Sequence, residues 1–317
     1  MNARRGSRRL AMVGVRPAGA ASFRRGAVSG LASAALFGIS APVAKLLLPR
    51  VDSWMLAGLL YLGAGVGLTG LRIVQRNGKR RSEPRRNPFS AADWWRLVGI
   101  AVIGGGAGPV LLLTGLRHVS GVAGALLLNL EGVFTMLLAV SVFGERLMRR
   151  ELLAAGVVIA GAMVLSLGSG TLAVEFVGVV AIAAACLAWG VDNNLTARLS
   201  QRNAISLVQF KTLTAGAGNL GLALLAGRAL PSGSSLAASF VVGFICYGLS
   251  IVLDVYALRY IGAAREAAFF ATAPFAGALV AIPLLHEPVT GNEVAGGLIM
   301  AMGIALMVRA RAWDAGS

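Results

Sequence analysis

The amino-acid sequence predicts an all-α integral membrane protein, with about ten transmembrane helices arranged as two five-helix inverted repeats. The first observation behind this prediction is composition: 57% of the residues are hydrophobic and only 13% are charged. A soluble chain carries roughly a quarter charged residues. The mean hydropathy of +0.77 points the same way. A further observation is that several residues of the two halves of the chain match at a constant offset. Water solvates such a surface poorly, so lipid is the expected solvent.

Apolar runs that are long enough to cross a bilayer follow one another along almost the whole chain. Such a helix needs about 20 mostly apolar residues. The predicted spans are residues 27–48, 53–74, 94–116, 120–143, 150–168, 175–197, 205–226, 236–258, 263–285 and 291–309. Most connections are short, so neighbouring helices run antiparallel. The long basic segment 75–96 is the exception, because Pro84 and Pro88 exclude a helix there. Trp94 and Trp95 then anchor the third span at the membrane interface.

The distribution of arginine and lysine predicts the orientation. With the N-terminus inside, residues 1–26 form a disordered basic cytoplasmic tail, and most other basic residues also fall in the cytoplasm. The outside receives Lys45, Arg50, Arg117 and Arg228. Residues 310–317 form a short cytoplasmic tail. We therefore expect a multi-pass protein of the plasma membrane with both termini inside. An arginine-rich, acid-poor start is also typical of an organelle transit peptide, and that alternative stays open.

Charge and cysteine usage narrow the expected partners. The chain has 29 basic and 13 acidic residues, a formal charge of +16. The basic residues lie in the tail and loops with almost no aromatic residues between them, so membrane orientation explains them and nucleic acid is not an expected partner. Cys186 and Cys246 both lie in apolar runs and are interpreted as packing residues. Neither a disulfide scaffold nor a cysteine metal site is expected.

An internal repeat divides the chain into residues 27–168 and 175–309. Glu145 and Glu287 are separated by 287 − 145 = 142 residues, and the same offset links Glu151 to Glu293 and Gly161 to Gly303. Near the first span the offset is 190 − 38 = 152, which sets Phe37-Gly38 opposite Trp189-Gly190. Each half holds five predicted spans, an odd number, so the second half enters the membrane from the opposite side. Inverted repeats are typical of secondary transporters, with the substrate site near the midplane between the halves.

Two segments carry a family resemblance. The first half contains LLLNLEGVFT at 126–135 followed by FGERL at 143–147, and the second contains APFA at 273–276 followed by LHEP at 285–288. These segments resemble the EamA-type transporters of the drug/metabolite transporter superfamily over about residues 28–309. In that family a proline near the middle of the helix is usual, which Pro274 matches and Gly132 does not. The resemblance implies a ten-helix exporter or importer of metabolites, often amino acids or related compounds.

Glu131 is the strongest candidate for the substrate or ion pathway. It lies near the centre of the fourth span, where intramembrane ionisable groups are usually functional. The alternative is a protonated Glu131 that hydrogen-bonds a neighbouring helix. Thr135 shares its helical face. Asn129 lies about 200° around the helix from Glu131, so it is also a candidate for helix–helix contact.

Further polar residues interrupt the later spans. Trp189, Asp192 and Asn193 lie towards the end of the sixth span, as a cavity lining or as a wet helix terminus. Lys211 and Asn219 lie on the seventh span and Asp254 on the eighth. Asp192, Lys211 and Asp254 reach the same depth and are predicted to form an inner ionic gate; independent snorkelling of each group to water is the alternative. Lys45 is expected to snorkel outward. Glu145 and Glu287 are expected to cap the helices that follow them.

The expected function is secondary transport of a small metabolite by alternating access, with export as the expected direction. The expected partners are a small-molecule substrate, the lipid bilayer and protons as a candidate coupling ion. No cofactor, metal or enzyme activity is expected, because neither a phosphate-binding GxxxxGK[ST] motif nor GxSxG or HExxH occurs. A membrane-embedded enzyme and a channel are the alternatives.

Overall fold

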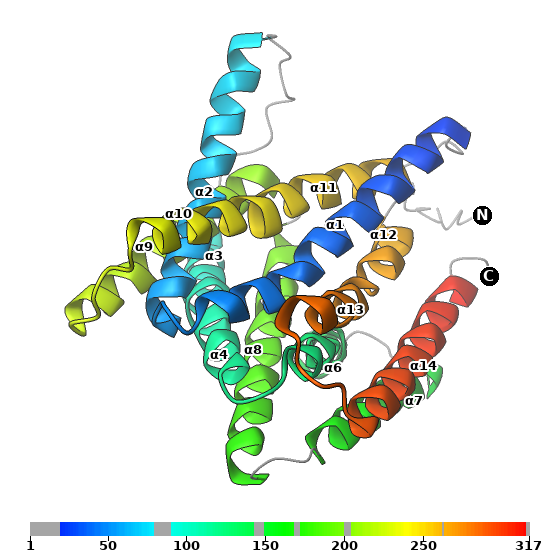
Figure 1. The fold of residues 1–317 in the computed structure, drawn as a ribbon. Helices are drawn as coiled ribbons and strands as arrows, with labels where there is room; N and C mark the ends of the chain where they lie inside the picture. Colours follow the sequence, from blue (N-terminus) through cyan, green and yellow to red (C-terminus); the bar gives the residue numbers. More distant parts are fainter. Residues whose placement is uncertain are drawn as a thin grey trace, which may run out of the picture.

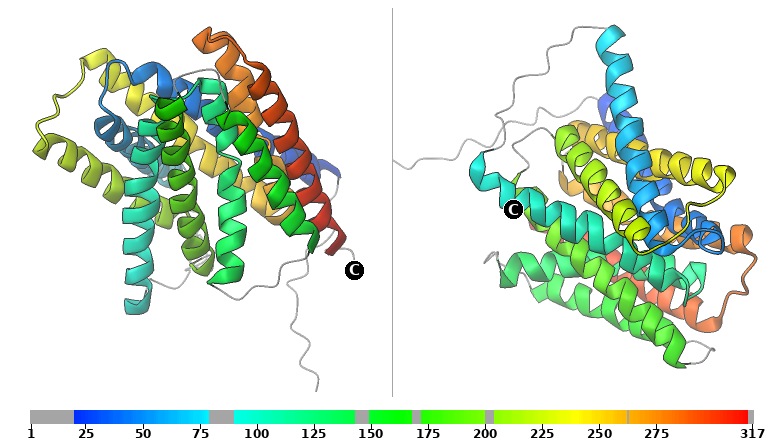
Figure 2. Two further views of the ribbon diagram at one scale, coloured as in Figure 1. Left: turned by 90° about the horizontal axis from the view of Figure 1, so that it is seen from below. Right: turned by 90° about the vertical axis from the view of Figure 1, so that its left-hand side faces the viewer.

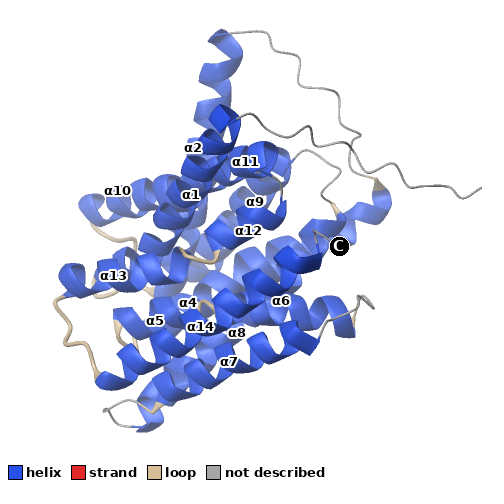
Figure 3. Cartoon of the chain, turned by 90° about the vertical axis from the view of Figure 1, so that its right-hand side faces the viewer, coloured by secondary structure: helices blue, strands red, loops and turns tan. Residues whose placement is uncertain are grey.

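The computed structural model describes residues 20–78, 90–142, 149–167, 172–199, 204–261 and 263–314. These residues form helices joined by short turns and contain no strand (Figure 3). The α-helices are α1 (Ala20–Leu47), α2 (Ser53–Gly78), α3 (Trp94–Gly99), α4 (Gly108–Leu116), α5 (Gly121–Leu127), α6 (Leu130–Ser141), α7 (Arg149–Ser166), α8 (Leu172–Arg198), α9 (Ala204–Leu225), α10 (Gly233–Val242), α11 (Ser250–Ile261), α12 (Ala263–Phe270), α13 (Ala273–Leu285) and α14 (Gly291–Asp314). A 3₁₀ turn, η1 (Ala91–Asp93), and two π-helical segments, η2 (Ile100–Ala107) and η3 (Gly243–Leu249), complete them.

Eight helical stretches in the described part of the chain are long and apolar enough to cross a membrane. They are Phe23–Leu47, Ser53–Val74, Trp94–Leu116, Gly121–Ser141, Glu175–Arg198, Gly233–Ala257, Glu266–Leu285 and Gly291–Arg309. Each coincides with a predicted span. The other two predicted spans, 150–168 and 205–226, are the helices α7, of 18 residues, and α9, of 22. Charged residues open α7 and polar ones dilute α9, so their crossing of the membrane remains a prediction.

The bundle has two ends that differ in charge. The start of α1 and the end of α14 lie on the same side (Figure 1), which we call the arginine-rich end. Basic residues at helix termini there include Arg24, Arg25, Arg149, Arg198 and Arg309. At the other end, which we call the opposite end, lie Lys45, Arg117 and Arg228.

Two of the spans are broken in the middle, and the breaks recur within one residue of the repeat offset. The span α5–α6 breaks at Leu128–Asn129 and the span α12–α13 at Ala271–Thr272, and 271 − 128 = 143, one more than the offset of 142. In the first break the Asn129 side-chain amide donates to the carbonyl of Leu126 at 2.9 Å. In the second the Thr272 hydroxyl donates to the carbonyl of Phe269 at 2.6 Å. A side chain that bonds a carbonyl three residues back competes with the regular helical bond in both places.

The second break has an additional cause. Pro274 lies in the first turn of α13, where its missing N–H cannot continue the hydrogen-bond ladder of α12. Its counterpart in the first half is Gly132, since 274 − 132 = 142. The first break therefore forms without the proline that is usual in the family, and Asn129 performs that local role.

The third and eighth spans each contain a π-helical turn, and these turns also match at the repeat offset: 249 − 107 = 142. π-helical turns are rare and occur frequently at functional sites. Here η2 packs against α8 and α9, while η3 packs against α1 and α2. The irregular backbone of each half thus faces helices of the other half.

The halves interlock through helix pairs that cross between them. The helices α7 and α14 lie side by side (Figure 2), α2 packs on α9, and α1 packs on α11 and α13. Small residues allow the close approaches. A Cβ at Gly38 would clash with the backbone of Ala273, and one at Gly190 would crowd the backbone of Phe134 and Thr135. The pair Gly38/Gly190 picked out by the sequence repeat thus marks where α1 and α8 meet the two broken spans.

Candidate functional site

A cavity of about 320 Å³ lies between helices from both halves of the chain. Its charged lining residues are Glu131, Asp192, Lys211, Asp254 and Glu266. Its aromatic lining residues are Phe37, Tyr61, Trp189, Tyr247 and Phe270. Small-molecule sites are mostly apolar pockets of roughly 300–1,000 Å³ with a few polar groups, and this cavity fits that description.

The cavity lies in the middle of the bundle and towards its arginine-rich end. Asp254 and Glu266 come from the parts of α11 and α12 near that end, and Asp192 and Lys211 from the corresponding parts of α8 and α9. Glu131 lies deeper, directly after the break in α5–α6. Charged groups from five spans therefore face one cavity. One comes from the fourth span, and one comes from each of the sixth to ninth spans.

An ion pair between Lys211 and Asp192 joins α9 to α8 at the cavity wall. The Lys211 ammonium bonds Asp192 Oδ2, and the Asp192 residue is 3% exposed. Gly104 of η2 makes room for this carboxylate, because a Cβ there would overlap the Asp192 side chain. Within the described residues, Asp192 Oδ1 is buried and has no hydrogen-bond partner. One carboxylate oxygen is thus neutralised by lysine and the other is left open.

The glycine-rich segment of η2 supplies acceptors to the cavity wall. The carbonyl of Gly104 accepts from Trp189 Nε1 at 2.8 Å and from the Tyr61 hydroxyl at 3.4 Å. The carbonyls of Gly105 and Gly106 each accept from Asn219 Nδ2 at 3.3 Å. Because π-helical geometry tilts carbonyls out of the regular ladder, these glycines fix the side chains that surround the cavity.

Glu131, Thr135 and Asn193 form one hydrogen-bonded group. Asn193 Nδ2 donates to Glu131 Oε1 at 2.8 Å and to Thr135 Oγ1 at 3.2 Å. The neighbouring Asn194 donates to the carbonyl of Thr135 at 2.9 Å. The shared face predicted for Glu131 and Thr135 therefore meets the polar turn of α8, and Glu131 reaches the cavity from there.

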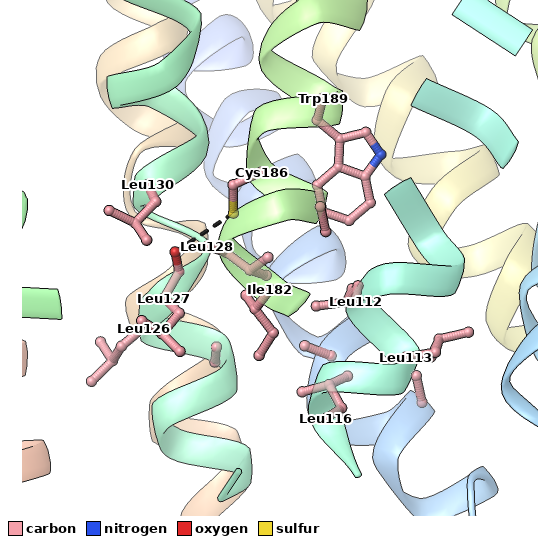
Figure 4. Close-up of a cluster of buried hydrophobic side chains, with 14 of the residues drawn as sticks. Leu112, Leu113, Leu116, Leu126, Leu127, Leu128, Leu130, Ile182, Cys186 and Trp189 are labelled. Carbon is pink, nitrogen blue, oxygen red and sulfur yellow. Dashed lines mark hydrogen bonds between the residues drawn. The ribbon is translucent and has the colours of Figure 1, made fainter. Parts of the chain in front are cut away.

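The Cys186 thiol contacts the same broken span from α8. It points at the carbonyl of Leu127, just before the break, with Sγ 3.6 Å from the oxygen (Figure 4). The surrounding residues are leucines and Ile182, and Trp189 follows one turn later on α8. Both cysteines are buried and free, as expected for packing residues.

Asp254 and Glu266 form a second acidic site on the cavity wall. The two carboxyl groups interact directly across α11 and α12. Glu266 is 8% exposed, and its Oε1 has no hydrogen-bond partner among the described residues. Asp254 was predicted to join Lys211 and Asp192; it lines the same cavity, and the partner that it contacts here is Glu266. Glu266 was not among the candidate residues predicted from the sequence. Its position one turn inside an apolar span was the available signal.

Three predicted site residues are absent from the cavity lining. Asn129 is buried and holds the α5–α6 break. Asn219 bonds the η2 carbonyls, and Thr135 contacts the cavity through Asn193. These residues shape the helices that line the cavity, while Glu131, Trp189, Asp192, Asn193, Lys211 and Asp254 line it directly.

A polar cluster at the opposite end corrects two expectations. Lys45 does not snorkel alone: its ammonium contacts Glu287 Oε1 at 2.9 Å and also bonds the carbonyl of Val119. Glu287 does not cap the helix that follows it; its Oε2 accepts from the N–H of Gly121 at 2.6 Å and so caps α5. Glu293 caps α14 instead, through the N–H of Thr290. The expected cap at Glu145 lies outside the described residues.

A helical membrane bundle with a charged central cavity between its halves is the architecture of a membrane transporter for small molecules. Comparison with known families agrees. Residues 24–167 and 176–309 each match the EamA-like transporter family, and the chain belongs to this family. The resemblance expected from the sequence is thereby confirmed, and the chain is a multi-pass membrane transporter.

Two known proteins illustrate the similarity. An uncharacterized transporter of Methanothermobacter thermautotrophicus is 28% identical over 300 residues, which cover 89% of this chain and 85% of that protein. A crystal structure that is 19% identical superposes with a TM-score of 0.64 over 89% of this chain and 95% of the other, which establishes likeness of fold. Family and relative both point to transport rather than enzyme catalysis.

Proposed function

We propose that the chain is a secondary transporter that exports a small metabolite, such as an amino acid or a related compound, by alternating access. The observation that carries this proposal is the cavity itself: it lies inside the bundle, it takes charged residues from both halves, and it lies nearer one end. A channel needs a path open at both ends, whereas the polar cluster around Lys45 and Glu287 closes the opposite end here.

The proposal includes ten membrane-crossing helices in two inverted five-helix repeats. Two family matches support it, as do paired π-helical turns at the repeat offset and paired breaks within one residue of that offset. It also places the arginine-rich end in the cytoplasm of a plasma-membrane protein, as the positive-inside rule predicts. On this orientation the described conformation is inward-facing.

Transport in this scheme alternates which end of the bundle is closed. Opening the opposite end separates Lys45 from Glu287, and closing the arginine-rich end brings Asp254 towards the Lys211–Asp192 pair, which is already formed in the described conformation. Protons are the proposed coupling ion, and Glu131 is the proposed carrier. A carboxyl group between the polar turn of α8 and the cavity can bind a proton at one stage and another partner at the next.

A single experiment tests transport and orientation together. The full chain is reconstituted in liposomes and is also expressed in cells. Small molecules are then profiled on both sides of the membrane, with and without the protein. We expect selective, saturable export of amino compounds. Cysteine introduced at Ser234 should react with an impermeant reagent outside cells, and cysteine at Ser90 should not. Flux that never saturates would replace the transporter proposal with a channel, and the reverse labelling pattern would invert the orientation.

A further inference from the structure

The buried acceptors and donors of the cavity differ in whether they have hydrogen-bond partners. Two buried side-chain oxygens lack a hydrogen-bond partner, Asp192 Oδ1 and Glu266 Oε1. Both are carboxylate oxygens, and both residues line the cavity. They lie on different helices, α8 and α12, so they are two separate observations. A buried acceptor left unpaired costs free energy, and a partner that arrives in the cavity would remove that cost.

The main donor side chains that line the same cavity each have a partner already. Trp189 Nε1 bonds the carbonyl of Gly104, and Asn193 Nδ2 bonds Glu131 and Thr135. The Lys211 ammonium bonds Asp192 Oδ2. Because two buried acceptors of the described lining are unpaired while each of these donor groups has a partner, the complementary ligand is one that brings N–H donors of its own.

The charges point to the same ligand. The described lining holds four carboxyl groups, those of Glu131, Asp192, Asp254 and Glu266, and one ammonium, that of Lys211. Excess negative charge in a site of low dielectric constant requires compensation by a cation or by protons. An anionic ligand would add to the imbalance, whereas a cationic ligand would reduce it.

The aromatic lining suits a cation that carries an apolar body. Phe37 lies 5.2 Å from Phe270 and 6.0 Å from Tyr247 between ring centroids, and Tyr247 lies 5.8 Å from Tyr61. The four rings form a continuous wall. Aromatic faces attract ammonium groups and also accept hydrocarbon.

We propose that the cavity recognises its substrate through a protonated amine: the ammonium N–H groups bind Asp192 Oδ1 or the Glu266 carboxylate, and the apolar body lies on the aromatic wall. This inference rests on the proposed function and narrows its substrate class to small organic cations and zwitterions with an exposed amine. A carboxylate on the ligand is not required, and an organic anion without an amine is excluded.

A matched set of three probes tests the inference: 2-phenylethylamine, 2-phenylethanol and 3-phenylpropanoate, which share an aromatic body and differ in charge. Equilibrium binding is measured on the purified full chain in detergent. We expect the amine to bind at least about tenfold more tightly than the alcohol or the carboxylate. Equal or tighter binding of the carboxylate would overturn the inference, as would absence of saturable amine binding.

Variants locate the binding group. Glu266→Gln should weaken amine binding about tenfold, because an amide offers less charge and presents its own N–H. Asp192→Asn should act in the same direction, and elution as a monodisperse species in size-exclusion chromatography shows that each variant is folded. Glu175→Gln, at the far end of α8, is the matched control and should leave binding unchanged. Unchanged amine affinity in both cavity variants would overturn the inference.

The proposed function fails by a different result. Exchange of preloaded amine across liposomes reports transport, while the affinity ratio of the three probes reports recognition. A carboxylate that exchanges saturably would retain the transporter and overturn the amine preference. Amine binding without exchange would support the preference and overturn secondary transport.

Discussion

The two broken spans, α5–α6 and α12–α13, have the same backbone irregularity and present different chemistry. The two breaks lie within one residue of the repeat offset, and in each a side chain bonds a carbonyl three residues back. Just after the first break stands Glu131, and its counterpart after the second is Ala273, since 273 − 131 = 142. The counterpart of Asp192 on α8 is likewise uncharged, because it is Ser40 on α1, since 192 − 40 = 152.

The comparison separates what the repeat supplies from what each half adds. The repeated backbone provides two breaks and two π-helical turns. The charges are contributed once, by one member of each related pair. The unequal placement of charge therefore selects the residues that we propose for recognition and coupling. The predictions below test this division, in order of decreasing expected effect.

The Lys211–Asp192 pair should be the most sensitive point of the cavity. Lys211→Met leaves a buried carboxylate without its cation, so we expect loss of transport and a loss of stability of about 3–5 kcal/mol. Asp192→Asn in the same chain should restore part of the stability. Lys211→Asp combined with Asp192→Lys tests the pairing by charge exchange. Detergent-solubilised unfolding and liposome exchange provide the two measurements.

The surface pair Arg228–Asp52 is the matched control for this prediction. Its charged groups lie 3.7 Å apart, and the Arg228 side chain is 58% exposed. Arg228→Met should cost less than about 1 kcal/mol. If Lys211→Met costs no more than Arg228→Met, and no charge exchange alters transport, Lys211 contributes no structural or gating pair.

Glu131 should separate coupling from exchange. Glu131→Gln retains the shape and can still accept from Asn193, but it cannot carry an ionisable proton. We expect exchange of substrate to continue while accumulation driven by a pH gradient falls at least about tenfold. Glu175→Gln is again the control. Full pH-driven accumulation in Glu131→Gln liposomes would remove Glu131 as the proton carrier.

The opposite end provides a smaller effect. Glu287→Gln weakens the contact with Lys45, whose side chain is 19% exposed against 27% for Glu287. Partly exposed ion pairs contribute about 1 kcal/mol or less, which shifts a two-state equilibrium up to about fivefold. The test uses a cysteine placed at Ile251 in a chain whose Cys186 and Cys246 are replaced by alanine. Adding Glu287→Gln to this chain should make the cysteine react faster with a thiol reagent supplied from the opposite side. Arg50→Met is the control, and identical rates in both variants would mean that the pair does not hold this end closed.

Eight of the ten predicted spans coincide with apolar helices of sufficient length in the described residues, because apolar length is a local property. The sequence also placed Glu131, Asp192 and Lys211 among the candidate residues, since charge inside an apolar run is visible without a structure. It did not predict Glu266 as a lining residue, because its role depends on how α12 meets α11. Likewise nothing in the sequence indicated what the carbonyls of the glycines at 104–106 bind. That their carbonyls bind Trp189 and Asn219 follows from the π-helical turn, which no local pattern in the sequence indicated.

The two breaks themselves should differ in how much one side chain matters. The first break depends on Asn129, which is buried and bonds the carbonyl of Leu126, while Gly132 supplies no restraint of its own. The second break has both the Thr272 hydroxyl and Pro274. We therefore expect Asn129→Ala to lower the free energy of unfolding by about 1 kcal/mol, the usual value of a buried hydrogen bond, and Thr272→Ala to lower it by less.

Thermal unfolding of the two purified variants in the same detergent measures the difference. Pro274→Ala in the Thr272→Ala background should then reveal the restraint that the proline provides, because the restored N–H lets α12 continue towards α13 as a regular helix. The double variant should lose transport even where it remains folded, since straightening this span moves Glu266 relative to Asp254. If Thr272→Ala costs as much as Asn129→Ala, the proline does not support the second break, and the two breaks are held in the same way despite their different sequences.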